Sequence, residues 1–324
     1  VIRKAVMQAM RIMGHQFVFG RTIKEALKQR SKRDADSRLF SFDMLGEGAR
    51  TAADAERYQS LYRQVIQDVG HAIKDEGDDI ANRSSVSIKL SALHPRYEAV
   101  KKHRVMTELL PRVKELALLA KEYKMQLTID AEEADRLDIS LDLFESLARD
   151  PDLDGWQGLG LVVQAYQKRG PALIEWLIAL AEETGRHFPT RLVKGAYWDS
   201  EIKHTQELGL ADYPVWTRKV TTDLCYLDCA RRMLAAPHAF YPQFATPTAQ
   251  SLAAVANMGE GAVMEFQRLH GMGDLLYKSA AKVIRDMPNV RVYAPVGAHE
   301  DLLPYLVRRL LENGANSSFV NRFM

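Results

Sequence analysis

The feature of this sequence that most restricts its fold is a regular alternation of short apolar runs with longer amphipathic stretches. Eight runs rich in β-branched and aromatic residues can be picked out, each followed by a segment with helical periodicity. Most of them are nearly continuous apolar segments, which is typical of parallel strands covered on both faces. The runs occupy residues 39–45, 85–93, 126–132, 158–165, 190–197, 241–246, 262–271 and 290–297.

Eight strand–helix units in a chain of 324 residues predict an α/β fold, a (β/α)8 barrel of the TIM type. The residues ahead of the first run read as an extra N-terminal helical arm. We therefore expect two units, an arm over residues 1–35 and a barrel over residues 36–324. The sequence opens on Val1 and closes on "FVNRFM", and we expect it to be a piece of a longer protein.

The composition excludes several classes of protein. The 44 basic and 42 acidic residues give a formal net charge of +2, which gives no indication of a nucleic-acid partner. No run of about 18 apolar residues is present to span a membrane, and no signal peptide is evident. Cys225 and Cys229 are expected to pack as small hydrophobes in a reducing compartment. We expect a cytoplasmic protein.

Polar side chains gather where the predicted strands end, which is where barrel enzymes place their chemistry. Taken singly, each has a structural interpretation as a helix cap or an interior ion pair. Together they need partners or ligands, because many charged groups would be buried in one barrel mouth. They are Asp43, Glu47, Lys89, Asp130, Glu132, Glu133, Gln164, Arg191, Lys194, Tyr197, Trp198, Gln267, His270, Tyr293 and His299.

Metal and phosphate motifs are not found. The histidines are scattered, with no i, i+4 pair on one helix, so we expect no metal site. There is no P-loop, and "GLGL" at residues 158–161 lacks the third glycine of a dinucleotide-binding fingerprint.

Two adjacent arginines, Arg308 and Arg309, lie in the apolar stretch "LVRRLLENGANSSF". Neighbours on a helix point about 100° apart, so at most one of them faces solvent comfortably. One interpretation is a solvated helix edge. The other is a clamp for a carboxylate or phosphate, since guanidinium groups match the geometry of both anions.

Several long segments resemble one family. "SIKLSALHPRYE", "TIDAEEADRLD", "RLVKGAYWDSEIK", "EFQRLHGMGDLLY" and "YAPVGAHEDLLPYLVRRLLENGANSSFVNR" are similar to the proline dehydrogenase domains of the bacterial proline utilization A family. The resemblance implies a distorted barrel that binds FAD non-covalently and oxidises L-proline to Δ1-pyrroline-5-carboxylate. It also implies a quinone as electron acceptor, an aldehyde-dehydrogenase domain in the full-length chain, and a peripheral contact with the inner face of the membrane.

The resemblance also implies roles for individual residues on the substrate side. Asp130 would lie near the substrate ring and support Tyr197. Glu47 would pair with the first arginine as a gate, and Tyr293 would clash with a ring hydroxyl and so disfavour hydroxyproline. The catalytic residues would be Lys89, Asp130, Tyr197 and Arg191. The substrate-binding residues would be Lys89, Glu47, Tyr197, Leu269, Tyr293, Arg308 and Arg309.

On the cofactor side, the resemblance implies that Arg191 bonds near flavin N5 and Gln164 reads the edge of the isoalloxazine ring. The sequence departs from the family at Pro247 and Thr248, where the family has His-Asn after the same Phe-Ala-Thr. The departure falls toward the adenosine part of FAD, and we expect FAD still to bind. The cofactor-binding residues would be Gln164, Val163, Arg191, Lys194, Gly195, Trp198, Thr217, Thr246 and Glu312.

The mechanism that we expect from the resemblance is hydride transfer from proline C5 to flavin N5, with the amine neutral beforehand. Two other functions stay open on the residues alone. A Schiff-base aldolase would use Lys89 or Lys194 as its amine. A non-catalytic barrel would bind an acidic metabolite through Arg308 and Arg309.

Overall fold

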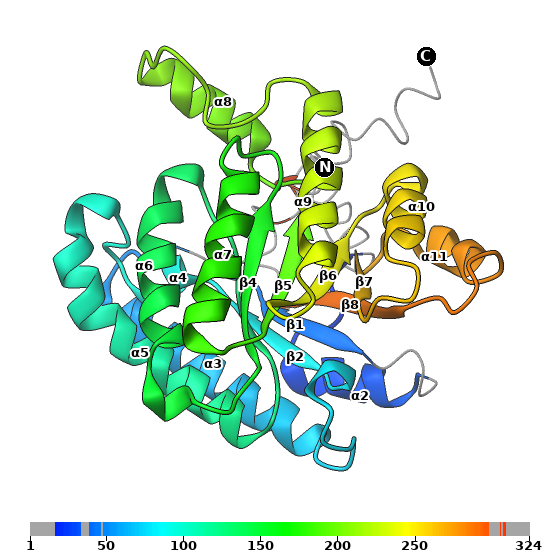
Figure 1. Ribbon diagram of the computed structural model, residues 1–324. Coiled ribbons are helices and arrows are strands. Elements are labelled where there is room, and N and C mark those ends of the chain that lie inside the picture. The colour runs from blue at the N-terminus through cyan, green and yellow to red at the C-terminus, as the bar shows by residue number, and fades with distance from the viewer. Residues whose placement is uncertain (1–16, 34–38, 47, 298–304, 306, 309–324) are drawn as a thin grey trace, which may run out of the picture.

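The protein folds into a closed barrel of parallel strands surrounded by helices (Figure 1). The computed structural model describes residues 17–33, 39–46, 48–297, 305, 307 and 308. Strand order follows the sequence, and β8 pairs with β1 to close the barrel. The strands are β1 Phe40–Met44, β2 Ser85–Ile88, β3 Leu127–Ile129, β4 Leu159–Gln164, β5 Phe188–Val193, β6 Phe240–Ala245, β7 Glu265–Leu269 and β8 Asn289–Val296.

The predicted (β/α)8 barrel is confirmed, and each of the eight apolar runs overlaps one of these strands. The largest difference is in the run over residues 85–93. There β2 ends at Ile88, and the short helix α4 occupies Leu90–Leu93. A short apolar run fits a buried strand and a buried helix turn equally well, so periodicity does not place this boundary.

Helices follow the strands and cover the outside of the barrel (Figure 1). Short 3-10 turns lie at η2 Ile80–Asn82, η3 Ala99–Lys101, η4 Ala134–Arg136 and η5 Pro151–Leu153. The remaining helices are α2 Ile23–Ser31, α3 Ala52–Ala72, α5 Lys102–Glu122, α6 Leu137–Ala148, α7 Gly170–Thr184, α8 Trp198–Glu207, α9 Lys219–Ala235, α10 Ala249–Met258 and α11 Asp274–Ala280.

Local sequence explains where the two helices α3 and α7 begin and end. Thr51 and Asp54 form a reciprocal capping box at the start of α3, which satisfies backbone N–H groups of the first turn. Pro171 lies in the first turn of α7, where it removes no hydrogen bond from the helix. Gly185 ends α7 with φ of 64°, a conformation that favours glycine.

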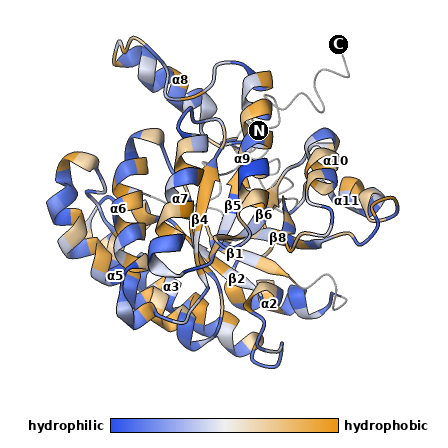
Figure 2. Ribbon diagram, viewed as in Figure 1, coloured by the Kyte–Doolittle hydropathy of each residue, from blue (hydrophilic) through white to orange (hydrophobic). Residues whose placement is uncertain are grey.

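The two faces of the barrel strands differ in polarity. Their outward side chains join the helices in the main hydrophobic core, and β4 is the most clearly apolar of the strands seen in Figure 2. The free thiols of Cys225 and Cys229 are buried in this core, as predicted. The inward side chains are largely polar and bond across the lumen: Gln243 Nε2 on β6 donates to Gln126 Oε1 beside β3 at 2.9 Å.

The segment before β1 is joined to the barrel by backbone hydrogen bonds. The N–H of Phe19 donates to the carbonyl of Pro295 at 2.8 Å, and that of Gly297 donates to Gly20 at 3.0 Å. The predicted boundary at residue 35 lies outside the described residues, and the division into arm and barrel stays a prediction. None of the helices described here combines the length and apolar character needed to cross a bilayer.

Candidate active site

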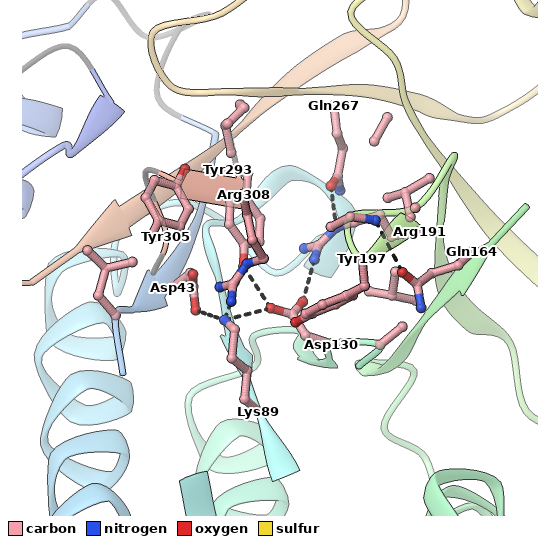
Figure 3. Close-up of a pocket in the computed structure, with 18 of the residues that line it drawn as sticks. Asp43, Lys89, Asp130, Gln164, Arg191, Tyr197, Gln267, Tyr293, Tyr305 and Arg308 are labelled. Atoms are coloured by element: carbon pink, nitrogen blue, oxygen red, sulfur yellow. Dashed lines mark hydrogen bonds and ion pairs between the residues drawn. The ribbon is translucent and has the colours of Figure 1, made fainter. Parts of the chain in front are cut away.

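A cavity of about 440 Å³ opens at the carboxyl ends of the strands (Figure 3). This is the end at which a (β/α)8 barrel places its functional groups, because the loops after the strands meet there. Residues of all eight strands, or those directly after them, line it. Both apolar and cationic side chains line the cavity.

Lys89 lies at the centre of the polar wall. It follows β2 directly, and its backbone N–H donates to the hydroxyl of Tyr62 on α3 at 3.1 Å, which fixes its place. Its Nζ donates to Asp43 Oδ1 at 2.5 Å and to Asp130 Oδ2 at 3.2 Å. The Tyr293 hydroxyl donates to the same Asp130 oxygen at 2.7 Å.

These contacts set the charge states of the group. Burial opposes the charge on Lys89, but Asp43, Tyr293 and Asp130 outweigh it and raise the pKa of Lys89 well above its ordinary value. Burial also opposes the charge on Asp130, yet Lys89 and Arg191 lower the pKa of this carboxyl. At Asp43 burial prevails over the attraction of Lys89, and the pKa of Asp43 is raised. Lys89 is therefore a fixed cation, and Asp130 is a poor base.

Arg191 on β5 is the second buried cation of the cavity. Its Nη1 donates to Asp130 Oδ1 at 2.7 Å and its Nε to Gln267 Oε1 at 2.6 Å. Its Nη2 donates to the hydroxyls of Ser41 and Ser87, each at 3.0 Å. The guanidinium also lies over the ring of Tyr293, 4.9 Å from its centroid.

Arg308 brings a third cation to the cavity from the far end of the sequence. Its guanidinium carbon lies 5.3 Å from the ring centroid of Tyr197, a cation–π contact that directs the side chain inward. The neighbouring Val307 is 44% exposed. For Arg308, the interpretation as a solvated helix edge is wrong, because this side chain lines the cavity.

Cationic side chains outnumber acidic ones among the described residues that line the cavity. Seven of its lining residues are Arg or Lys and three are Asp. Such an excess favours an anionic ligand, because cations in a partly closed pocket attract and orient a carboxylate or phosphate. Among the described residues, no group of three His, Cys, Asp or Glu side chains is arranged to hold a metal ion.

A comparison with known protein families adds an independent observation. The family model described as proline dehydrogenase matches residues 26–322, which is most of the chain. The chain belongs to the proline dehydrogenase family. Enzymes of this family are oxidoreductases, and the charged barrel mouth is the candidate active site.

Relatives in the proline dehydrogenase family are of two lengths. The bifunctional protein PutA of Salmonella typhimurium is 54% identical over 99% of this chain, which covers 25% of that relative. Proline dehydrogenase 1 of Bacillus subtilis is 26% identical over 96% of this chain and 90% of its own length. The chain thus spans about a quarter of the length of its PutA relatives.

Solved structures of the family share the fold. A Bradyrhizobium japonicum proline utilization A mutant matches with a TM-score of 0.88 and 53% identity, over 98% of this chain and 32% of that one. Proline utilization A from Bdellovibrio bacteriovorus, inactivated by N-propargylglycine, matches with a TM-score of 0.91 and 27% identity, over 99% and 35%.

Most of the residues that the sequence predicted for a proline dehydrogenase site meet in this cavity. The roles of these residues are still predictions. The same holds for the expected support of Tyr197 by Asp130. The predicted residues that line the cavity are Lys89, Asp130, Gln164, Arg191, Lys194, Gly195, Tyr197, Thr246, Leu269, Tyr293 and Arg308.

Three predicted cofactor residues do not line it. Val163 points outward into the core, as the residue between the inward-facing Val162 and Gln164 must. Trp198 packs beside Tyr197, and its indole N–H donates to the carbonyl of Trp216 at 2.8 Å. Thr217 is exposed on the segment before α9. Glu47, Arg309 and Glu312 lie outside the described residues.

Other cavity residues were not predicted as site residues. Asp43 lies one residue before the end of β1, and in the sequence it is one polar residue among several at the strand ends. Tyr58 on α3 and Tyr305 line the cavity, and in sequence they resemble ordinary apolar positions of amphipathic helices. The alternation Ser41–Asp43 within β1 is a signal that identifies an inward-facing polar edge.

On the side where β4 and β5 end, Gln164 and Lys194 are held by local contacts. Gln164 Nε2 donates to the carbonyl of Glu132 at 2.8 Å, and its Oε1 accepts from the backbone of Ala196 at 3.4 Å. Lys194 Nζ donates to Asp223 on α9 at 2.6 Å. Burial lowers the pKa of Lys194 despite this carboxylate.

Proposed function

We propose that this chain oxidises L-proline to Δ1-pyrroline-5-carboxylate with FAD as its cofactor, the first step of proline catabolism. The observation that carries the proposal is a barrel mouth with surplus cations, walled by aromatic and aliphatic side chains, in a member of the proline dehydrogenase family. Such a site has a place for one carboxylate and one small saturated ring.

The carboxylate of proline would be held by the cations that the structure places around the cavity. Lys89 is fixed in its charged form by its carboxylate neighbours, and Arg308 lines the same cavity. A buried hydrogen bond to a charged group contributes about 1.5–3 kcal/mol, so two or three such bonds are enough to orient a small ligand. Arg309 is proposed as a further member of this clamp on the resemblance alone.

The pyrrolidine ring would pack between Tyr197, Leu269 and Tyr293, all of which line the cavity. The hydroxyl of Tyr293 is fixed by its bond to Asp130 at 2.7 Å. A side chain held in this way cannot easily move aside for a substituent on the ring. We therefore propose that proline is preferred over hydroxyproline.

The residues present fit a flavin. Arg191 and Lys194 provide a cationic edge of the cavity. The side chains of Val162 and Ala196, which also line it, are small and leave room for a flat ring. In a bound complex, Arg191 and Gln164 would face the flavin ring, and Lys194 and Thr246 would lie toward the phosphate-bearing part. When bound, FAD would supply a hydride acceptor at N5 for the hydrogen on C5 of proline.

The chain's own part in this reaction would be alignment and charge placement. Proline must lose its amine proton before the C=N bond forms, and the cations that hold its carboxylate also disfavour a second positive charge beside them. Arg191 and Lys89 would stabilise the negative charge that hydride transfer adds. Asp130 stays ionised as the partner of both cations and acts as a positioning group.

The contacts of the two candidate lysines argue against a Schiff-base aldolase. Such an enzyme needs a neutral amine, whereas the raised pKa of Lys89 keeps its Nζ protonated. The pKa of Lys194 is lowered, but its Nζ is engaged by Asp223.

Further proposals concern the full-length protein and the location and partners of this segment. Its electrons would pass to a quinone, through a peripheral contact with the inner face of the membrane. An aldehyde-dehydrogenase domain would occupy part of the sequence by which the PutA relatives exceed this chain. We propose a cytoplasmic location and no nucleic-acid contact by this segment.

An absorption spectrum recorded before and after anaerobic addition of L-proline tests the proposal. We expect a yellow protein whose flavin band disappears. A protein that remains colourless with added FAD contradicts the cofactor. A flavin band that proline leaves unchanged contradicts the reaction and favours a barrel that only binds an acidic metabolite. Borohydride trapping of a substrate on a lysine would favour the aldolase.

A further inference from the structure

A second charged group lies deeper in the barrel lumen, below the cavity. Arg291 on β8 and Glu265 on β7 are both 0% exposed. Arg291 Nε donates to Glu265 Oε1 at 2.7 Å, and its Nη2 donates to Oε2 at 2.9 Å. The Tyr241 hydroxyl donates to Oε2 at 3.1 Å. We call Arg291 and Glu265 the lower ion pair.

Gln267 connects the lower ion pair to the active-site cavity. It lies two residues after Glu265 on β7, so both side chains face the lumen. Gln267 Nε2 donates to Glu265 Oε1 at 2.6 Å, and its Oε1 accepts from Arg191 Nε at 2.6 Å.

Only one orientation of this amide satisfies both neighbours. A carboxylate only accepts hydrogen bonds and a guanidinium only donates them. If the amide were reversed, its oxygen would face the Glu265 carboxylate and its NH₂ would face the Arg191 guanidinium. Both contacts would then be repulsive in a buried site, where unsatisfied polar groups are costly. Glu265 therefore determines which end of Gln267 is presented to Arg191.

Gln267 in turn fixes the plane of the Arg191 guanidinium. The bonds to Gln267, Asp130, Ser41 and Ser87 engage four of its five N–H groups. The remaining N–H belongs to Nη1, the nitrogen that also bonds Asp130 at the cavity wall. A rotation of the plane that breaks the bond to Gln267 would redirect this last donor.

We propose that Glu265 is a positioning residue of the active site, which orients Arg191 toward the cavity through the amide of Gln267. Arg291 fixes the Glu265 carboxylate in place through two hydrogen bonds. The effect on catalysis rests on the proposed dehydrogenase function, whereas the effect on the orientation of Arg191 does not.

Two double variants that differ in one property provide the test. Glu265→Gln/Arg291→Met removes both charges and keeps an oxygen that accepts from Gln267. Glu265→Leu/Arg291→Met also removes both charges but removes this acceptor. Neither variant leaves a buried charge without a partner, which is the main risk to folding.

The readouts are the 15N–1H resonance of the Arg191 Nε–H group, assigned by its loss in Arg191→Lys, and kcat for proline. The resonance is recorded with and without FAD. We expect the acceptor-keeping variant to retain the resonance of the unmodified protein. In the leucine variant we expect the resonance to shift or exchange with solvent, and kcat to fall about 10- to 100-fold below the acceptor-keeping variant, with a smaller change in KM.

If the Arg191 resonance is the same in the two variants, the proposal is overturned. It is also overturned if the resonance is displaced in the leucine variant but kcat is the same in both. If the unmodified protein does not oxidise proline, the proposed function fails, while the resonances still decide the positioning role. If the leucine variant does not fold, Glu265→Asp takes its place, because it keeps the charge opposite Arg291 and withdraws the carboxylate by one methylene. It must displace the same resonance, and an unchanged resonance overturns the proposal.

Discussion

The two ends of the barrel lumen hold similar charged groups, but those at one end are fully buried and those at the other line a cavity. In the lower ion pair, Arg291 directs its donors to Glu265 and to the carbonyls of Arg83 at 2.6 Å and Ala81 at 2.7 Å. Charge is balanced there and no surface is exposed. At the cavity, Lys89, Arg191 and Arg308 outnumber Asp43 and Asp130, and all five line an open space.

This difference separates structural charges from functional ones. The lower ion pair has no exposed surface, so it can support the fold and orient its neighbours but cannot contact a ligand. The cations at the cavity line an open space, so an anionic ligand can reach them. Removing one charge of the lower ion pair should mainly lower stability, and it should reach activity only through Gln267 and Arg191. Substitutions at the cavity should change activity directly.

The largest effect on activity is expected from Lys89→Met. This change removes the cation between Asp43 and Asp130 and leaves two buried carboxylates without their shared partner. Lys89 is proposed to stabilise the charge that develops in the transition state, and removing one such group costs about 2.7–4 kcal/mol, or about 10²- to 10³-fold in kcat/KM. Steady-state kinetics with proline measure it, with Lys121→Met on α5 as a control. Activity within tenfold of the unmodified protein would show that Lys89 is not part of the site.

The largest effect on stability is expected from Arg291→Met. It leaves the Glu265 carboxylate fully buried without its cation, at a cost of about 3–5 kcal/mol in the free energy of unfolding. Urea denaturation measures the loss. Arg232→Met, which breaks a more exposed pair with Asp228, should cost about 1 kcal/mol or less. Equal losses in the two variants would mean that the lower ion pair does not support the fold.

A smaller, pH-dependent effect is expected from Glu132→Gln at the edge of the cavity. Burial raises the pKa of Glu132 to about 7 from an ordinary value of 4.5. Between pH 4.5 and about 7, Glu132 keeps its proton in the folded protein but loses it in the unfolded chain. The free energy of unfolding therefore falls as the pH rises through this range, and it stays at the lower value above pH 7.

Replacing Glu132 by glutamine should remove this fall and stabilise the protein by about 3 kcal/mol at pH 8, with little effect at pH 4.5. Thermal unfolding at several pH values measures it, and the exposed Glu122→Gln should change neither the stability nor its slope. A Glu132→Gln protein that follows the pH profile of the unmodified chain would contradict a carboxyl held neutral by burial.

The fold was predictable from the sequence because burial on both faces makes parallel strands apolar over most of their length. The position of the site followed from the fold, and Lys89, Asp130, Arg191 and Tyr293 were all expected at strand ends. The lower ion pair was not singled out. The sequence feature that indicates it is the two-residue period of a strand. Glu265 and Gln267 face the same side of β7, and Arg291 and Tyr293 face the same side of β8.

What the sequence could not supply is the pairing between strands distant in the chain. Glu265 and Arg291 each lie in a run that reads as an ordinary strand, and only the β7–β8 register brings them together. The amide orientation of Gln267 depends on two neighbours, 2 residues and 76 residues away. Such coupling is a property of the closed barrel, because residues far apart in sequence meet only inside its lumen.

At the cavity, Arg308 is proposed to hold the carboxylate of proline together with Lys89. The most direct measurement is the KM for proline of Arg308→Met beside that of the unmodified protein. Losing one charge-assisted hydrogen bond of about 1.5–3 kcal/mol predicts a KM raised about 10- to 100-fold, with kcat much less affected. An unchanged KM would contradict the claim.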